Sequence, residues 1–180
     1  ILLLDTGLGF QKNGILQLHQ NLMDAGISLS DITKVLVTHL HKDHAGGLGE
    51  ERDGLGARLS MPNAIYYVQQ DELAFAFEKG FPSFITEELE CLRNNEQVHL
   101  LEGDGLIDDY IEYRVTRAHS PHHQVFWIRD ENETIFFGAD DAPQQTRMGV
   151  LERRRTQLPQ AGRRTDDDLL HEPAPVDRRP

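Results

Sequence analysis

The spacing of apolar residues in the first part of the chain predicts strands that alternate with helices. Residues 1–5 form a short apolar run that ends in Asp5-Thr6-Gly7, which is typical of a buried strand followed by a turn. Residues 34–38 are rich in β-branched side chains and predict another strand. Between them, residues 15–25 predict a helix closed by Gly26, because apolar side chains recur there at helical spacing: Ile15, Leu18, Leu22 and Met23. The order strand, helix, strand predicts an α/β domain.

After residue 44 the pattern predicts a loop, then one strand and two helices, and only strands from residue 97 onward. Residues 45–63 are rich in glycine and have no clear period, which predicts a long loop that flanks a site as a substrate flap, with Arg52 and Arg58 as candidate contacts for an anionic substrate. Asp130–Glu133 has turn chemistry and predicts a hairpin. The other predicted elements are strands at 64–68, 97–101, 111–116, 125–129 and 134–137, and helices at 71–79 and 86–94.

The pattern stops after about residue 147. Residues 148–180 lack aromatic side chains and any sustained apolar period, so they predict a disordered or non-native tail behind a domain at 1–147. The chain opens on an apolar strand without an initiator Met, which predicts that the domain is incomplete at its N-terminus as well. The localisation is therefore open, with the cytoplasm favoured because no export signal is visible. No apolar run is long enough to span a membrane, so we expect no membrane partner.

Charge and cysteine content narrow the candidate partners. The net charge is −12, and an acidic domain repels a phosphate backbone, so nucleic acid is not an expected partner. The single cysteine, Cys91, excludes an internal disulfide and a cysteine-rich metal site. It lies in the predicted helix at 86–94, where we interpret it as a buried and inert thiol.

Six of the nine histidines fall into two short windows, and the first of these has the spacing of a metal site. The first window reads H-x-H-x-D-H from His39 to His44, directly after a predicted strand. His39 and His41 are two residues apart and project to one side of an extended chain, whereas Asp43 and His44 can address a second point. Gly46 and Gly47 are expected to let the backbone bend sharply behind them. Neutral imidazoles and a carboxylate suit zinc, with iron and manganese as alternatives.

Two further segments offer ligands from elsewhere in the chain. The second histidine window, His119-Ser-Pro-His122-His123, lies between two predicted strands, and its chemistry alone does not select one histidine. A strand also runs into Asp140 and Asp141, where a carboxylate could bridge two cations or cap a turn.

Together these motifs resemble the metallo-β-lactamase superfamily, in its glyoxalase II and lactonase-like branch, over residues 1 to about 147. The H-x-H-x-D-H run is the most specific part. Asp5-Thr6-Gly7 is similar to the strand-end aspartate motif of the family, and the segment that begins at His119 is similar to its G-H-T-P-G-H motif. Phe137-Gly-Ala-Asp140 is similar to the family's strand ending in Gly-Asp, with Ala139 in place of the glycine.

The resemblance implies an αββα sandwich with a dinuclear site at one edge. It assigns His39, His41 and His119 to metal one, and Asp43, His44 and Asp140 to metal two, with Asp140 shared. Asp43 is also the candidate catalytic residue, because it can orient the nucleophile. Asp5, His123 and Asp141 are expected beside the ligands rather than on the metals. The family supplies one more histidine to metal two from a later strand; His171 is the only later histidine here, and its surroundings lack such a strand.

The resemblance also implies a reaction. Two zinc ions per chain would generate a metal-bound hydroxide that attacks an ester, lactone or thioester bond of a small molecule. The alternatives are an oxidoreductase that resembles the mononuclear-iron persulfide dioxygenases of the superfamily, and an inactive fragment of a metallo-hydrolase.

Overall fold

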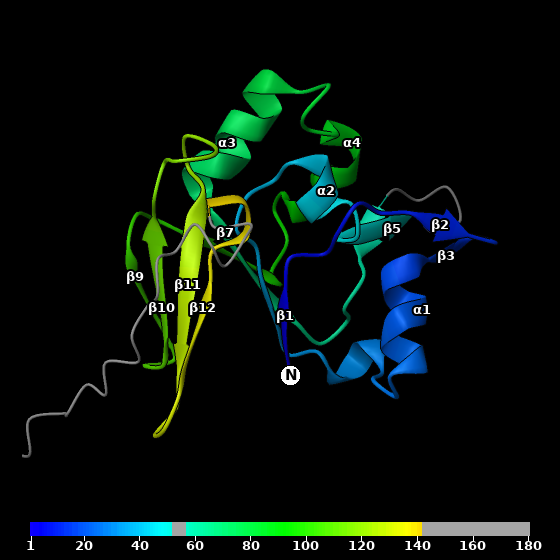
Figure 1. The fold of residues 1–180 in the computed structure, drawn as a ribbon. Helices are drawn as coiled ribbons and strands as arrows, with labels where there is room; N and C mark the ends of the chain where they lie inside the picture. The colour runs from blue at the N-terminus through cyan, green and yellow to red at the C-terminus, as the bar shows by residue number, and fades with distance from the viewer. Residues whose placement is uncertain (52–56, 142–180) are drawn as a thin grey trace, which may run out of the picture.

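Two four-stranded sheets form the framework of the chain in the computed structural model, which describes residues 1–51 and 57–141 (Figure 1). The predicted tail at 148–180, including His171, and Arg52 lie outside the described residues. The sheets pack on each other, so the α/β sandwich expected from the sequence is confirmed. In Figure 1 the helices lie on the side of the first sheet and along one edge, and none of those described lies over the outer face of the second sheet.

The first sheet is parallel and has the order β1-β4-β7-β8. Parallel neighbours require crossover connections, and each of the three connections in this sheet contains a helix. α1 (Gln17–Asp24) connects the first two strands, and α3 (Gln70–Lys79) follows the third. The strands are β1 (Leu2–Leu4), β4 (Lys34–Leu36), β7 (Ile65–Gln69) and β8 (Val98–Leu101).

The second sheet is an antiparallel meander with the order β12-β11-β10-β9. The predicted hairpin between its last two strands is confirmed: the Asp130 side chain accepts hydrogen bonds from the backbone of Asn132 and Glu133 at 2.8 Å. Its strands are β9 (Gly105–Ile107), β10 (Ile111–Val115), β11 (Gln124–Arg129) and β12 (Thr134–Phe137).

The core has two parts, one on each face of the first sheet. Val35 packs among the helices and Leu36 packs against the second sheet, because successive strand residues point to opposite faces. The buried residues between the sheets are Leu36, Leu101, Ile107, Ile111, Tyr113 and Phe126. This layer fixes the position of one sheet on the other.

The structure corrects the predicted loop at 45–63. Its segments β5 (Gly49–Glu51) and β6 (Ala57–Leu59) pair as an antiparallel ribbon. Arg58 lies on β6 and lines a groove whose other residues include none of the candidate metal ligands. The predicted contact between Arg58 and a substrate at the metal centre is therefore not supported by its position. The sequence does not predict these strands because neither has a run of β-branched or consecutive apolar residues, unlike the equally short β1 and β4.

Other short elements also differ from the predictions. The helix predicted at 15–25 begins later, because Ile15 and Leu16 form β3 and pair with β2 (Gln11–Lys12). Its Met23 is half exposed, and His19 is the buried residue of α1. The helix predicted at 86–94 divides into α4 (Thr86–Leu89) and η2 (Glu90–Leu92). The remaining elements are η1 (Leu29–Asp31), α2 (Lys42–Ala45) and η3 (Ala139–Asp141).

Cys91 is buried, as predicted. Desolvation raises the pKa of its thiol to about 11, so it remains protonated and unreactive near neutral pH. No helix in the described ranges is long and apolar enough to cross a bilayer.

Candidate metal centre

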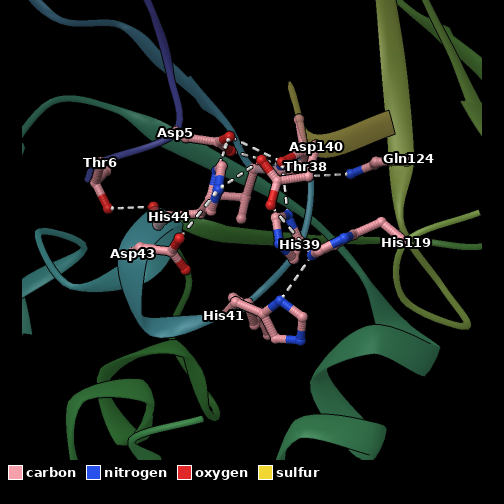
Figure 2. A network of polar contacts seen from close by, with 12 residues as sticks. Asp5, Thr6, Thr38, His39, His41, Asp43, His44, His119, Gln124 and Asp140 are labelled. Atoms are coloured by element: carbon pink, nitrogen blue, oxygen red, sulfur yellow. Dashed lines mark hydrogen bonds and ion pairs between the residues drawn. The ribbon is translucent and has the colours of Figure 1, made fainter. Parts of the chain in front are cut away.

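The candidate ligands meet at one edge of the sandwich, where the chain leaves strands of both sheets (Figure 2). The first histidine window follows β4, and His119 lies in the connection between β10 and β11. Asp140 follows β12. The carboxyl ends of parallel strands meet at one edge, and the meander brings two of its connections to the same edge. Residues far apart in the sequence thus become neighbours.

His39, His41 and His119 form one compact group. One ring nitrogen from each lies within 4.8 Å of the others. Nδ1 of His41 and Nε2 of His119 are only 3.0 Å apart. His39 is fully buried, whereas His41 is partly exposed and His119 is exposed, so the group opens to solvent on one side. The structure brings together the residues predicted for metal one.

Asp140 lies between this group and His44. Its two carboxylate oxygens are 3.3 Å from Nε2 of His44 and 3.2 Å from Nε2 of His119. His39, His44 and Asp140 form a second compact group in which one ligand atom from each lies within 4.8 Å of the others. Asp43 lies at the margin, with its carboxylate 3.8 Å from Nε2 of His44 and its side chain more than half exposed. Asp140 therefore has the position expected of a shared carboxylate.

Asp5 contacts the Nδ1 side of His44, opposite the Nε2 atom that faces Asp140, as expected of a residue beside the ligands. Its carboxylate accepts hydrogen bonds from the backbone and the hydroxyl of Thr38, at 2.7 and 2.8 Å. Nδ1 of His44 lies 2.8 Å from the same carboxylate and donates to it, which leaves Nε2 of His44 directed at Asp140. Asp5 thus selects the tautomer and orientation of His44.

Thr38 orients His39 in the same way. Its hydroxyl donates to Asp5, so it accepts from Nδ1 of His39, 3.0 Å away. The lone pair of His39 is then on Nε2, which is buried and has no hydrogen-bond partner in the part of the chain that the structure describes. A buried acceptor without a partner is costly unless a cation or donor occupies the position in front of it.

His123 and Asp141 form a buried pair behind His39. The His123 ring is fully buried, 4.7 Å from the ring of His39, and its Nδ1 is 3.3 Å from a carboxylate oxygen of Asp141. Thr116 also donates to this carboxylate. His122 points elsewhere, towards Asp71 at 3.8 Å. The structure therefore places His123 and Asp141 beside the ligand group and His122 outside it.

The electrostatics of the centre keep most of its imidazoles neutral. Burial, together with the neighbouring histidines, lowers the pKa of His39 to about 2. Burial is also the main cause that lowers the pKa of His41 and of His123. His44 differs: burial opposes its protonation, but the hydrogen bond to Asp5 and the charges of Asp5, Asp140 and Asp43 together raise its pKa. Neutral imidazoles beside carboxylates are suited to bind a cation.

The spacing of the ring nitrogens fits a metal ion. Two nitrogen ligands at ~2.0–2.1 Å from a tetrahedral zinc ion lie about 3.3 Å from each other. The 3.0 Å between His41 and His119 is close to that separation. The buried Nε2 of His39, which has no hydrogen-bond partner among the described residues, completes a donor set that suits such an ion.

Comparison with known proteins agrees with this geometry. The sequence profile of the metallo-beta-lactamase superfamily matches residues 1–142. The chain belongs to this superfamily. The matched range contains all the candidate metal ligands described above.

Curated relatives include lactonases of this superfamily. The chain is 29% identical over 108 residues to the N-acyl homoserine lactonase AiiA of Bacillus thuringiensis subsp. kurstaki, which covers 59% of this chain and 36% of the relative. It is 28% identical over 118 residues to an N-acyl homoserine lactonase of Bacillus cereus, covering 65% of this chain and 41% of that protein. The chain therefore spans well under half the length of these relatives.

Solved structures show the same metallo-β-lactamase fold. A probable metal-dependent hydrolase from Staphylococcus aureus matches with a TM-score of 0.61 at 22% identity, covering 77% of this chain and 53% of that chain. AidC, a dizinc quorum-quenching lactonase, matches with a TM-score of 0.61 at 23% identity, covering 75% of this chain and 50% of its own.

Sequence reasoning missed several residues that support the centre. The pattern predicts Thr38 only as the end of a strand, and it does not single out Glu72 or Ser120. Glu72 carries no distinguishing signal in the sequence, because it follows Asp71 in the first turn of α3, where acidic residues are common.

Proposed function

We propose that the chain is the metal-binding core of a lactone hydrolase that uses two zinc ions. The supporting observation is that Asp140 contacts both His44 and His119, at 3.3 and 3.2 Å, so that one carboxylate joins two groups of candidate ligands. Lactonases among the curated relatives favour a ring ester as the substrate class.

The ligand assignment follows the sequence. His39, His41 and His119 would hold the first zinc; Asp43, His44 and Asp140 would hold the second, with Asp140 shared. Zinc held by these residues would lower the pKa of a bound water and polarise an ester carbonyl. Asp43 is the candidate to orient the attacking water, because its carboxylate is more than half exposed and lies 3.8 Å from Nε2 of His44.

The reaction adds one water molecule across the ring ester. The bond between the carbonyl carbon and the ring oxygen breaks, and the products are a carboxylate and an alcohol on one molecule. An N-acyl homoserine lactone is the specific substrate that we propose, since two related solved structures hold N-hexanoyl-L-homoserine, in one of them at the catalytic metal centre.

Two measurements on the purified chain test this proposal: its metal content and its rate of hydrolysis of N-hexanoyl homoserine lactone. We expect about two zinc ions per chain, loss of metal and activity in His39→Ala, and neither loss in His99→Ala. His99 is an exposed histidine on β8 and provides a matched control.

Other outcomes separate the alternatives. One zinc ion without hydrolysis would indicate that the second site is incomplete in this chain. Iron in the purified protein would favour the persulfide dioxygenase-like reaction. A folded chain that binds no metal would overturn the proposal.

A further inference from the structure

A buried carboxylate is hydrogen-bonded to residues next to the candidate ligands. Glu72 belongs to α3, and only 1% of its surface is exposed. Burial is the main cause that raises the pKa of its carboxyl group, and the hydrogen bonds that it accepts act in the opposite direction. An acidic side chain in such a position is costly unless its oxygens are paired.

Each oxygen of Glu72 accepts a hydrogen bond from a different segment of the chain. Oε1 accepts from the backbone N–H of Leu40 at 3.0 Å, and Oε2 accepts from the hydroxyl of Ser120 at 3.0 Å. Both donors are themselves buried. Water therefore does not compete readily with either bond, and both are stronger than an exposed equivalent.

The positions of the two donors in the sequence are informative. Leu40 is the residue between His39 and His41, and Ser120 directly follows His119. One carboxylate thus holds the backbone of the first histidine window and the connection between β10 and β11 that carries the third histidine. These segments are 78 residues apart at His41 and His119, and they leave different sheets.

We propose that Glu72 is a positioning residue that sets the separation of the His41 and His119 imidazoles, and thereby the affinity of the first metal site. This inference rests on the proposed function. Residues that orient ligands without touching the metal contribute about 10–100-fold to metal affinity. Without Glu72, Leu40 and Ser120 are no longer joined through one carboxylate, so more of the ordering of His41 and His119 must take place at the moment of binding.

Three variants of the full chain test the role of Glu72. Glu72→Gln keeps an acceptor for Leu40, but its amide no longer offers a second carboxylate oxygen to Ser120. Ser120→Ala removes the other bond with a small change in volume. Glu78→Gln makes the same chemical change as the first variant on the exposed end of the same helix and is the control.

Metal affinity is measured by competition with a chromophoric chelator, and coordination geometry by the visible spectrum of the cobalt-loaded chain. We expect Glu72→Gln and Ser120→Ala each to weaken the first site by roughly 10-fold or more. The double variant Glu72→Gln/Ser120→Ala should lose much less metal affinity than the product of the two single losses, because both changes break the same link. The cobalt spectrum should change in Glu72→Gln and Ser120→Ala and stay unchanged in Glu78→Gln. This result would distinguish a role in positioning the ligands from a general loss of stability.

A second measurement does not depend on metal. The rings of His41 and His119 have centroids 4.9 Å apart, so the metal-free protein should give an NMR cross-peak between their ring protons. We expect this cross-peak in the original chain and in Glu78→Gln, and its loss or weakening in Ser120→Ala. If the cross-peak and the affinity both persist in Ser120→Ala and Glu72→Gln, the role of Glu72 is overturned. If the original chain binds no metal, the proposed function fails, and the cross-peak alone decides about Glu72.

Discussion

At the scale of single residues, Asp5 orients the His44 imidazole directly and the Thr38 hydroxyl beside His39. It accepts hydrogen bonds from Thr38 and His44 and lies in the left-handed backbone region, with φ of 52°. Such a conformation is uncommon for a residue other than glycine and often marks a functional site. The interactions of Asp5 also raise the pKa of His44, although burial of the ring opposes this.

The raised pKa of His44 predicts how metal binding depends on pH. The protonated ring stabilises the metal-free fold below its ordinary pKa of 6.5, and this stabilisation is lost as pH rises through the higher folded pKa. Zinc must displace that proton, so its affinity for the second site should rise with pH through the same range. Asp5→Asn should shift the midpoint of zinc uptake to lower pH and weaken binding at high pH by about 10–100-fold.

Isothermal titration calorimetry of Asp5→Asn across pH 5.5–8.5, a range chosen around the ordinary pKa of ~6.5, checks this. Glu96→Gln is the control, because Glu96 is exposed and distant in sequence from every candidate ligand. An unchanged midpoint in Asp5→Asn would contradict the role assigned to Asp5.

Ala139 is a second residue whose backbone bears on the centre, because it directly precedes Asp140. Its φ is 41°, a region that favours glycine, and it stands where the resemblance expects glycine. Ala139→Gly should therefore stabilise the chain by roughly 0.5–1 kcal/mol, because relief of the left-handed conformation (about 1–2 kcal/mol) exceeds the cost of greater freedom in the unfolded chain (about 0.4–1 kcal/mol). Urea unfolding measures the change. Ala74→Gly on the exposed face of α3 should have the opposite sign, which makes the comparison decisive.

At the scale of elements, the segment after β1 is held tightly against α2. The backbone of Thr6 donates to the carbonyl of His44 at 2.8 Å, and the backbone of Gly46 donates to the carbonyl of Gly7 at 2.8 Å. Gly46 has a helical φ of −65°, so the sharp bend expected from the sequence is not the reason for glycine there. A Cβ atom at Gly46 would lie 2.5 Å from the carbonyl carbon of Leu8. Glycine is required for close approach of two backbones.

This contact predicts a large effect of a small substitution. Gly46→Ala should destabilise the chain by about 1–3 kcal/mol, because backbone atoms cannot move aside as a flexible side chain can. It should also weaken zinc binding, since α2 carries Asp43 and His44. Thermal unfolding with and without zinc measures both effects. A stable Gly46→Ala chain with unchanged zinc affinity would mean that α2 is not held in place by this contact.

At the scale of the whole molecule, the relative position of the sheets decides whether the centre exists. The candidate ligands come from both sheets, so the apolar layer between them also sets the distances within the centre. Leu36 is fully buried in that layer and lies three residues before His39.

Leu36→Ala should therefore lower the free energy of unfolding by about 2–5 kcal/mol. Leu106→Ala is a matched control, because Leu106 is 53% exposed on β9 and the same truncation should cost far less. Denaturant unfolding followed by the fluorescence of the single tryptophan, Trp127 on β11, measures both variants. Equal losses in the two variants would contradict the assignment of the core.

The sequence alone determined the features that depend on local spacing. The parallel strands, the helices α1 and α3 and the hairpin at Asp130 follow from apolar periods and turn residues that act over a few positions. The H-x-H-x-D-H run is recognisable for the same reason. Its four candidate ligands lie within six residues, between the end of β4 and the single turn of α2. β5 and β6 were not predictable, because they lack the run of apolar or β-branched residues that marks the equally short β1 and β4.

Only the tertiary structure decided which distant groups act together. Local spacing could not select His119 over His122 and His123, whereas the fold turns His119 towards His41 and Asp140, directs His122 at Asp71 and buries His123 behind His39. Glu72 likewise looked like one more acidic residue on a helix until its two hydrogen bonds were visible. The physical reason is that pairing between segments depends on how two sheets pack, and that packing is a property of the whole apolar core rather than of any motif.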